Sequence, residues 1–230
     1  MSKDKSEPKI AAALLYADLM RLGETAAEAE AAGCSEIFLH ITDGRMAPRL
    51  GFAPEFAAAV KRVTGLPCAA CLLMRDPEPW IAQCIAAGAD TVILQAEGST
   101  HIQRALTSIR EQGSKAGIAI NPGSSLTKLD YLLGDVERVH VFTSEWGFAD
   151  SRFIASSVER VAILRENLRE RKGHTGLSVD GPLTPYEAAR VVSEGADTLT
   201  LGSEILGRPE GLTAALDAYR RDLRARQLAL

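Results

Sequence analysis

Three segments of the sequence repeat one pattern, in which a helical stretch ends in glycine and a polar pair leads into an apolar run. The segments are AAGCSEIFL (31–39), AAGADTVIL (86–94) and SEGADTLTL (193–201). Glycine suits the left-handed residue that closes many helices, so each segment predicts a joint between a helix and a strand. The three glycines are separated by about two and four units of roughly 27 residues, a suitable size for one strand and one helix. Eight such units fill most of the 230 residues, so the spacing predicts a (β/α)8 barrel.

Apolar runs that fit strands alternate with patterns that fit helices along the whole chain. The expected strands cover residues 9–15, 36–41, 67–73, 91–95, 116–120, 138–143, 176–180 and 198–202. This alternation favours a parallel sheet that is covered on both faces. A doubly wound open sheet also has this alternation, but no G-x-G-x-x-G follows the first expected strand. No linker rich in Pro, Gly or Ser interrupts the chain, so we expect residues 1–230 to form one α/β domain, a TIM barrel.

Charge and composition exclude several classes of protein. The net charge is −4, so nothing indicates a basic surface for nucleic acid or for an anionic membrane. The longest apolar run, residues 10–17, is too short to span a bilayer. The polar first nine residues do not resemble a secretory signal. Four cysteines are too few for a disulfide scaffold, so reduced thiols in a cytoplasmic protein are expected.

Candidate functional residues stand at the ends of the expected strands, where barrels of this kind place their active sites. Asp180 ends the seventh expected strand, while His40 and Cys71 lie near the ends of the second and third. A lone cysteine in a strand usually packs as a small hydrophobe, and a lone histidine is as often a satisfied core residue as a functional one. Cys68 and Cys71 have the spacing of a redox or zinc pair. Residues i and i+3 of a strand point to opposite faces, however, so these two thiols are not expected to meet.

The strand-end motifs resemble those of the ribulose-phosphate 3-epimerase family, and the resemblance covers nearly the whole chain. It is carried by KIAAALLYADL, AAGCSEIFLHITDGRMAP, LPCAACLLMRDPEPWI, AAGADTVILQAEGSTH, KAGIAINPGSSL, WGFADSRFI, LSVDG and LGSEILG. The resemblance implies a TIM barrel that abstracts a proton next to a ketose-phosphate carbonyl and returns one on the other face. In this family two aspartates are the acid and the base, and a divalent metal stabilises the enediolate.

The sequence departs from the family at the positions that hold the metal. The His-x-Asp of the second strand is replaced by Phe38-Leu39-His40, and the third-strand histidine by Cys71. The seventh-strand aspartate, both ligand and acid or base, is retained as Asp180, while a first-strand serine is replaced by Ala13. Three ligands and an open position are typical of catalytic zinc, so His40, Cys71 and Asp180 are the predicted metal ligands, with Zn²⁺ as the candidate ion. Without a metal, His40 and Asp180 are predicted to face each other across the substrate as an acid/base pair.

The predicted phosphate site is also altered. Family members hold the phosphate with backbone N–H groups of glycine-rich turns after strands six, seven and eight. Gly147, Gly181, Gly202 and Ser203 match those turns and are the predicted phosphate-binding residues. The glycine after Gly181 is replaced by Pro182, which has no N–H, and the sixth turn carries Asp150, whose charge opposes a phosphate unless it points away.

Two functions are compatible with these residues. The first is an isomerase with a rebuilt site, acting on a small ketose phosphate or related sugar derivative. The second is a non-catalytic barrel of the same shape that binds a metabolite or a protein partner. The resemblance also implies a homo-oligomer. Trp146 and Phe148 are either a lid that excludes water from the site or ordinary loop packing.

Overall fold

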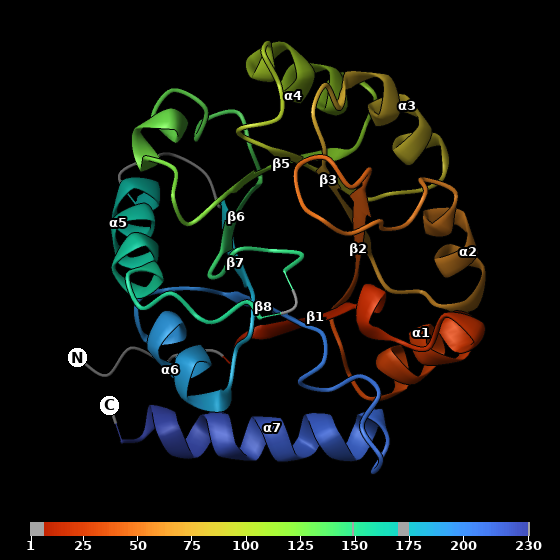
Figure 1. Ribbon diagram of the computed structural model, residues 1–230, viewed down its shortest axis with the longest axis vertical. Helices are drawn as coiled ribbons and strands as arrows, with labels where there is room; N and C mark the ends of the chain where they lie inside the picture. Colours follow the sequence, from red (N-terminus) through yellow and green to blue (C-terminus); the bar gives the residue numbers. More distant parts are fainter. Residues whose placement is uncertain (1–6, 149, 170–174, 230) are drawn as a thin grey trace.

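The computed structural model describes residues 7–148, 150–169 and 175–229 and shows a closed barrel of eight parallel strands in the order β1 to β8 (Figure 1). The strands are β1 (Lys9–Ala13), β2 (Glu36–Thr42), β3 (Cys68–Leu73), β4 (Thr91–Gln95), β5 (Lys115–Ile120), β6 (Arg138–Phe142), β7 (Gly176–Asp180) and β8 (Thr198–Leu201). Each predicted strand is present, and β8 pairs with β1 to close the sheet. The predicted α/β TIM barrel is therefore confirmed.

Helices surround the barrel and cover the outer face of the sheet (Figure 1). The α-helices are α1 (Leu22–Ala31), α2 (Phe56–Val63), α3 (Glu78–Ala86), α4 (Ile102–Glu111), α5 (Ser157–Arg169), α6 (Pro185–Ser193) and α7 (Leu212–Gln227). In the described part of the chain, none of them is long and apolar enough to cross a membrane. The segment between β5 and β6 forms the short 3₁₀ helix η3 (Leu126–Leu129), in which the Ser125 side chain caps the N–H of Thr127.

The three repeated joints have the backbone conformation that the sequence predicts. Gly33, Gly88 and Gly195 have φ angles of 79°, 94° and 110°, in the region that residues with a side chain rarely adopt. Each of these glycines lies three residues before the strand that follows it. The joints therefore set where each strand begins.

Aromatic and imidazole rings from opposite sides of the barrel meet in its interior. Phe38 of β2 stacks on His140 of β6, with ring centroids 4.8 Å apart and an interplanar angle of 21°. His140 also meets Phe142 edge-on at 4.9 Å. All three side chains are fully buried. Such offset and edge-on ring pairs stabilise a core beyond the area that they bury, so this part of the interior is filled and leaves no channel.

An ion pair joins β2 and β6 at the N-terminal ends of the strands, away from the loops that follow them. Arg138 donates from Nη1 to Glu36 Oε2 at 2.6 Å and from Nη2 to Glu36 Oε1 at 2.9 Å. The two side chains are 19% and 7% exposed. Bidentate geometry and partial burial are the conditions under which an ion pair contributes to stability.

We expect Glu36→Gln to lower the free energy of unfolding by about 3 kcal/mol, because it leaves the Arg138 guanidinium partly buried without its counter-charge. Urea unfolding followed by circular dichroism measures the change. The matched control is Glu166→Gln. The side chains of Arg169 and Glu166 are 53% and 65% exposed, so this substitution should lower the free energy of unfolding by at most about 1 kcal/mol. Equal losses from the two substitutions would contradict a stabilising role for the Glu36–Arg138 pair.

Candidate active site

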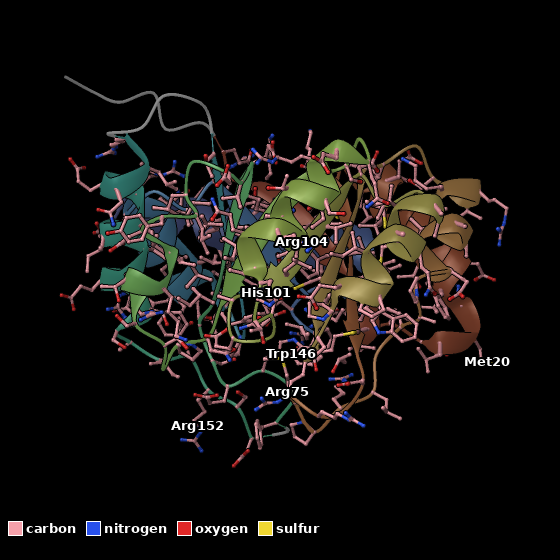
Figure 2. The ribbon with its side chains drawn as sticks, turned by 90° about the horizontal axis from the view of Figure 1, so that it is seen from above. Met20, Arg75, His101, Arg104, Trp146 and Arg152 are labelled. Carbon is pink, nitrogen blue, oxygen red and sulfur yellow. The ribbon has the colours of Figure 1, made fainter. Side chains whose placement is uncertain are left out.

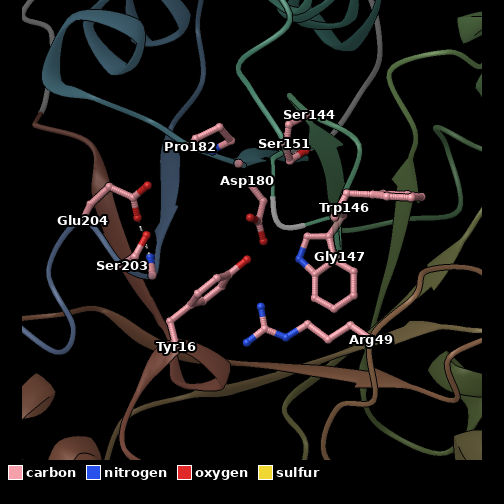
Figure 3. Close-up of a pocket in the computed structure, with 13 residues that line it drawn as sticks. Tyr16, Arg49, Ser144, Trp146, Gly147, Ser151, Asp180, Pro182, Ser203 and Glu204 are labelled. Atoms are coloured by element: carbon pink, nitrogen blue, oxygen red, sulfur yellow. Dashed lines mark hydrogen bonds between the residues drawn. The ribbon is translucent and has the colours of Figure 1, made fainter.

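A cavity opens at the C-terminal ends of the strands, where the loops after β1, β2, β6, β7 and β8 converge (Figure 3). Figure 2 shows Arg75, Trp146 and Arg152, from the loops after β3 and β6, at this same end of the barrel. The cavity is lined by Tyr16, Arg49, Ser144, Trp146, Gly147, Phe148, Ser151, Asp180, Gly181, Pro182, Gly202, Ser203 and Glu204. Barrel enzymes place their chemistry at this end, so we take this cavity as the candidate site.

His40 and Asp180 are in direct contact at the floor of the site. His40 Nε2 lies 2.8 Å from Asp180 Oδ2, and both side chains are buried. Asp180 lines the cavity, whereas His40 does not. Two groups in a hydrogen bond leave no room for a substrate carbon between them. The structure therefore holds His40 and Asp180 in contact instead of on two sides of a gap, and their role as an acid/base pair stays a prediction.

Trp146 covers His40 from the side of the loops. The indole and imidazole rings are stacked, with centroids 4.8 Å apart and an interplanar angle of 21°, and Trp146 is 7% exposed. Gly147 follows in a left-handed conformation, and a Cβ atom there would lie 2.8 Å from Ala47 Cβ, so the loop after β6 packs closely on the loop after β2. Phe148 lines the cavity but is half exposed. Trp146 thus shields His40 from solvent, and its role as a lid stays a prediction.

Two imidazoles favour the ionised form of Asp180. Burial alone raises the pKa of this carboxyl, but the nearby His40 and His140 side chains outweigh burial and lower the pKa below its ordinary value. His140 Nε2 lies 3.6 Å from Asp180 Oδ2, and its Nδ1 is 2.8 Å from Ser178 Oγ. Burial lowers the pKa of His140 itself. Sequence reasoning did not identify His140, whose position in the middle of β6 resembles that of a core residue.

The predicted metal ligands do not form a metal-binding group. Cys71 is fully buried and does not line the cavity, and burial raises the pKa of its thiol well above the ordinary value, which disfavours the thiolate that a metal needs. Phe38 occupies the position of the lost ligand and packs 4.9 Å from the His40 ring. Within the described ranges, no three His, Cys, Asp or Glu side chains are placed to hold an ion. The arrangement therefore differs from the predicted His40, Cys71 and Asp180 triad.

Two cavity residues that the sequence did not single out supply hydrogen-bond donors. Burial, and then the charge of Asp180, raise the pKa of Tyr16 above its ordinary value, so its hydroxyl stays protonated. The Arg49 guanidinium carbon lies 4.8 Å from the centre of the Tyr16 ring, and its Nη2 donates to the Leu15 carbonyl at 3.1 Å. Among the described residues the buried Trp146 Nε1 has no partner in full hydrogen-bond geometry, although its interaction with the Tyr16 hydroxyl offsets part of the rise in the Tyr16 pKa. In Figure 3 this indole nitrogen points toward the Tyr16 hydroxyl, with the Asp180 carboxylate and the Arg49 guanidinium at the same opening.

The four residues predicted to bind phosphate, Gly147, Gly181, Gly202 and Ser203, all line this cavity. The neighbouring carboxylate of Asp150 does not: it is exposed and lines an adjoining hollow, which shares Phe148 and Ser151 with the cavity. Their role in phosphate binding stays a prediction. The loop after β8 adds a carboxylate that was not anticipated, Glu204, whose pKa burial raises.

Sequence comparisons place these features among known proteins. The sequence model of the ribulose-phosphate 3 epimerase family matches residues 9–206. The chain is 34% identical to the chloroplastic ribulose-5-phosphate-3-epimerase of Arabidopsis thaliana, over 88% of this chain and 73% of the relative. It is 30% identical to the ribulose-phosphate 3-epimerase of Bacillus subtilis, over 88% and 94%, and 29% identical to that of Escherichia coli K12, over 93% and 95%.

Solved structures with the same architecture have low sequence identity and support the fold alone. The 3-keto-L-gulonate-6-phosphate decarboxylase of Vibrio cholerae superposes with a TM-score of 0.71 at 14% identity, over 97% of this chain and 99% of its own. The orotidine 5′-phosphate decarboxylase of Pyrococcus horikoshii superposes with a TM-score of 0.68 at 19% identity, over 94% and 99%.

We expect the protein purified without chelators to hold no stoichiometric zinc at His40 and Cys71, because these side chains and Asp180 do not form a ligand group. Mass-spectrometric metal analysis of the wild type, His40→Ala and Cys71→Ser measures this. Cys34→Ser is the matched control, because Cys34 is a buried thiol just before β2, at the end of the barrel opposite the cavity, and does not line it. One zinc per chain that disappears in both His40→Ala and Cys71→Ser, and persists in Cys34→Ser, would contradict the expectation.

Proposed function

Because the chain belongs to the ribulose-phosphate 3 epimerase family, we propose that it removes and returns a proton next to the carbonyl of a small ketose phosphate or related sugar derivative. One observation carries the proposal: the Asp180 carboxylate, kept ionised by its histidine neighbours, faces a small cavity that is also lined by neutral and cationic hydrogen-bond donors. Enolisation needs these two parts, a base for the proton and donors for the oxygen that gains charge.

Asp180 is the proposed base. Its Oδ2 is engaged by His40 Nε2, which leaves Oδ1 without a protein hydrogen bond among the described residues. The carboxylate enters the cavity from the tip of β7 (Figure 3). His40 is a positioning residue, because it holds Asp180 in one orientation and is itself held between the rings of Phe38 and Trp146. A base fixed in this way loses little freedom when the substrate binds.

Arg49, Tyr16 and Trp146 are the proposed stabilisers of the enediolate. As the proton leaves, negative charge moves to the carbonyl oxygen, and preorganised donors at that position lower the barrier. The guanidinium supplies a positive charge, while the Tyr16 hydroxyl and the Trp146 indole N–H supply neutral donors. Among the described residues the buried indole N–H meets the Tyr16 hydroxyl only outside full hydrogen-bond geometry, a state that is costly for a polar group. A substrate oxygen between these donors would satisfy it.

The family generally uses a divalent metal, which polarises the carbonyl and supports the same developing charge when it is bound. The residues at the corresponding positions of this chain do not fit such an ion, since Phe38 offers no ligand and the Cys71 thiol lies outside the cavity. The proposal therefore uses the side chains of this chain for charge stabilisation, and zinc has no part in it. The non-catalytic barrel is less well supported, because no feature of the cavity favours it over an enzyme.

We expect Asp180→Asn to lower the rate of deuterium incorporation into a substrate ketose by roughly 10²–10⁴-fold, the contribution typical of a positioned base. Proton NMR in D₂O, with D-ribulose 5-phosphate, D-ribulose and related ketoses as probes, measures the incorporation. Asp150→Asn is the matched control, because it makes the same chemical change outside the cavity and should leave the rate within about twofold.

The pH dependence of the same exchange gives a second readout. The folded pKa of Asp180 lies below the ordinary carboxyl value, so the base stays ionised above pH 4 and becomes protonated only in stronger acid. The rate should therefore show no acid limb assigned to Asp180 between about pH 5 and pH 8. Exchange in Asp180→Asn at the wild-type rate would exclude Asp180 as the base.

A further inference from the structure

The turn after β8 folds the Glu204 side chain back over the backbone at the ends of β7 and β8. Glu204 Oε2 accepts a hydrogen bond from the N–H of Gly202 at 2.9 Å, and Oε1 accepts one from the N–H of Leu183 at 3.3 Å. Figure 3 marks the first of these bonds beside Ser203, with Pro182 on the neighbouring wall of the cavity. A carboxyl group of the chain itself thus occupies two converging backbone donors.

These two donors lie where barrels of this kind commonly bind a phosphate. The loops after the seventh and eighth strands form an anion-binding nest from backbone N–H groups. Here Gly202 N and Leu183 N already donate to Glu204, and Pro182, between Gly181 and Leu183, has no N–H to offer. A phosphate could use these donors only by displacing the carboxylate.

The charge of the cavity acts in the same direction. Its lining includes two carboxyl groups, Asp180 and Glu204, and one guanidinium, Arg49. A phosphate monoester carries a charge of about −1.5 to −2 at neutral pH, so it would meet net repulsion at the Glu204 side of the cavity. If Glu204 is protonated instead, its carboxyl group still fills the space between Gly202 and Leu183.

We propose that Glu204 takes the place of a substrate phosphate and that this chain acts on a small ketose without a phosphate group. The inference rests on the proposed function, since it names the substrate class of that same site. Glu204 is then a specificity-determining residue: it satisfies the backbone donors in the free enzyme and rejects ligands that bring a second anion.

Two measurements on the wild type test the inference directly. Titration calorimetry with inorganic phosphate at pH 7 should show no saturable binding. Deuterium incorporation into D-ribulose should have a kcat/KM at least about tenfold above that for D-ribulose 5-phosphate. The reason is that Glu204 occupies the backbone donors, so the phosphate of the phosphorylated sugar makes no charge-assisted hydrogen bond with them. A wild-type preference for the phosphorylated sugar would overturn the inference and leave the proposed function standing.

Substitutions of Glu204 then identify the cause. Glu204→Ala frees Gly202 N and Leu183 N, and it should gain phosphate binding and move the kcat/KM ratio toward the phosphorylated sugar by at least about tenfold. Glu204→Gln keeps the volume of the side chain without its charge, and it should gain less phosphate binding than Glu204→Ala. Glu210→Ala, an exposed glutamate in the loop before α7, is the matched control and should change neither readout. Thermal unfolding of each variant checks that it is folded.

The remaining outcomes also decide the question. Phosphate binding by the wild type that Arg49→Leu removes would place the anion at Arg49 and overturn the inference. An unchanged phosphate affinity in folded Glu204→Ala would overturn it as well. If the wild type exchanges no ketose, the proposed function fails. A gain of phosphate binding in Glu204→Ala would still support Glu204 as the group that fills the nest.

Discussion

The hydrogen bond between His40 and Asp180 constrains the whole candidate site. It joins β2 and β7, which are not neighbours in the barrel, and it provides a partner for a carboxylate that burial would otherwise disfavour as an anion. Trp146 stacks on the imidazole and Phe38 packs beside it, so water is kept from this contact. The other carboxylate oxygen has no protein hydrogen bond among the described residues, and the carboxylate faces the cavity.

The departures from the family are consistent with one another. The lost ligand position holds Phe38, whose ring stacks on His140, and the thiol of Cys71 is sealed in the core. The charge stabilisation that a metal supplies elsewhere would fall to Arg49 and its neighbours in the cavity. On the opposite wall, an internal carboxylate occupies backbone donors. In the two proposals, side chains of this chain take the place of two added groups. Arg49 and its neighbours replace the metal that polarises the substrate, and Glu204 replaces the substrate phosphate at the backbone donors.

Much of the fold could be predicted from the sequence, because strand runs and glycine joints are local features. The region between β5 and β6 could not, since Ser125 and its neighbours form only a short 3₁₀ turn where the barrel repeat suggests a helix. Asp180 could be located because it ends a strand. Tyr16 and Arg49 could not: Tyr16 continues an apolar run, and Arg49 lies in a loop whose path depends on tertiary packing. The combination of Pro182 with an added carboxylate two residues after Gly202 was the one available signal for the altered nest.

In the proposed function, Asp180 and the donors of the cavity catalyse enolisation without a metal. The decisive measurement is deuterium incorporation into the best ketose substrate after exhaustive treatment of the wild type with EDTA and removal of the chelator. The rate should stay unchanged, and it should not increase when Zn²⁺, Mn²⁺ or Fe²⁺ is added back. A rate that falls to background with EDTA and returns with one of these ions would show that the reaction depends on a metal.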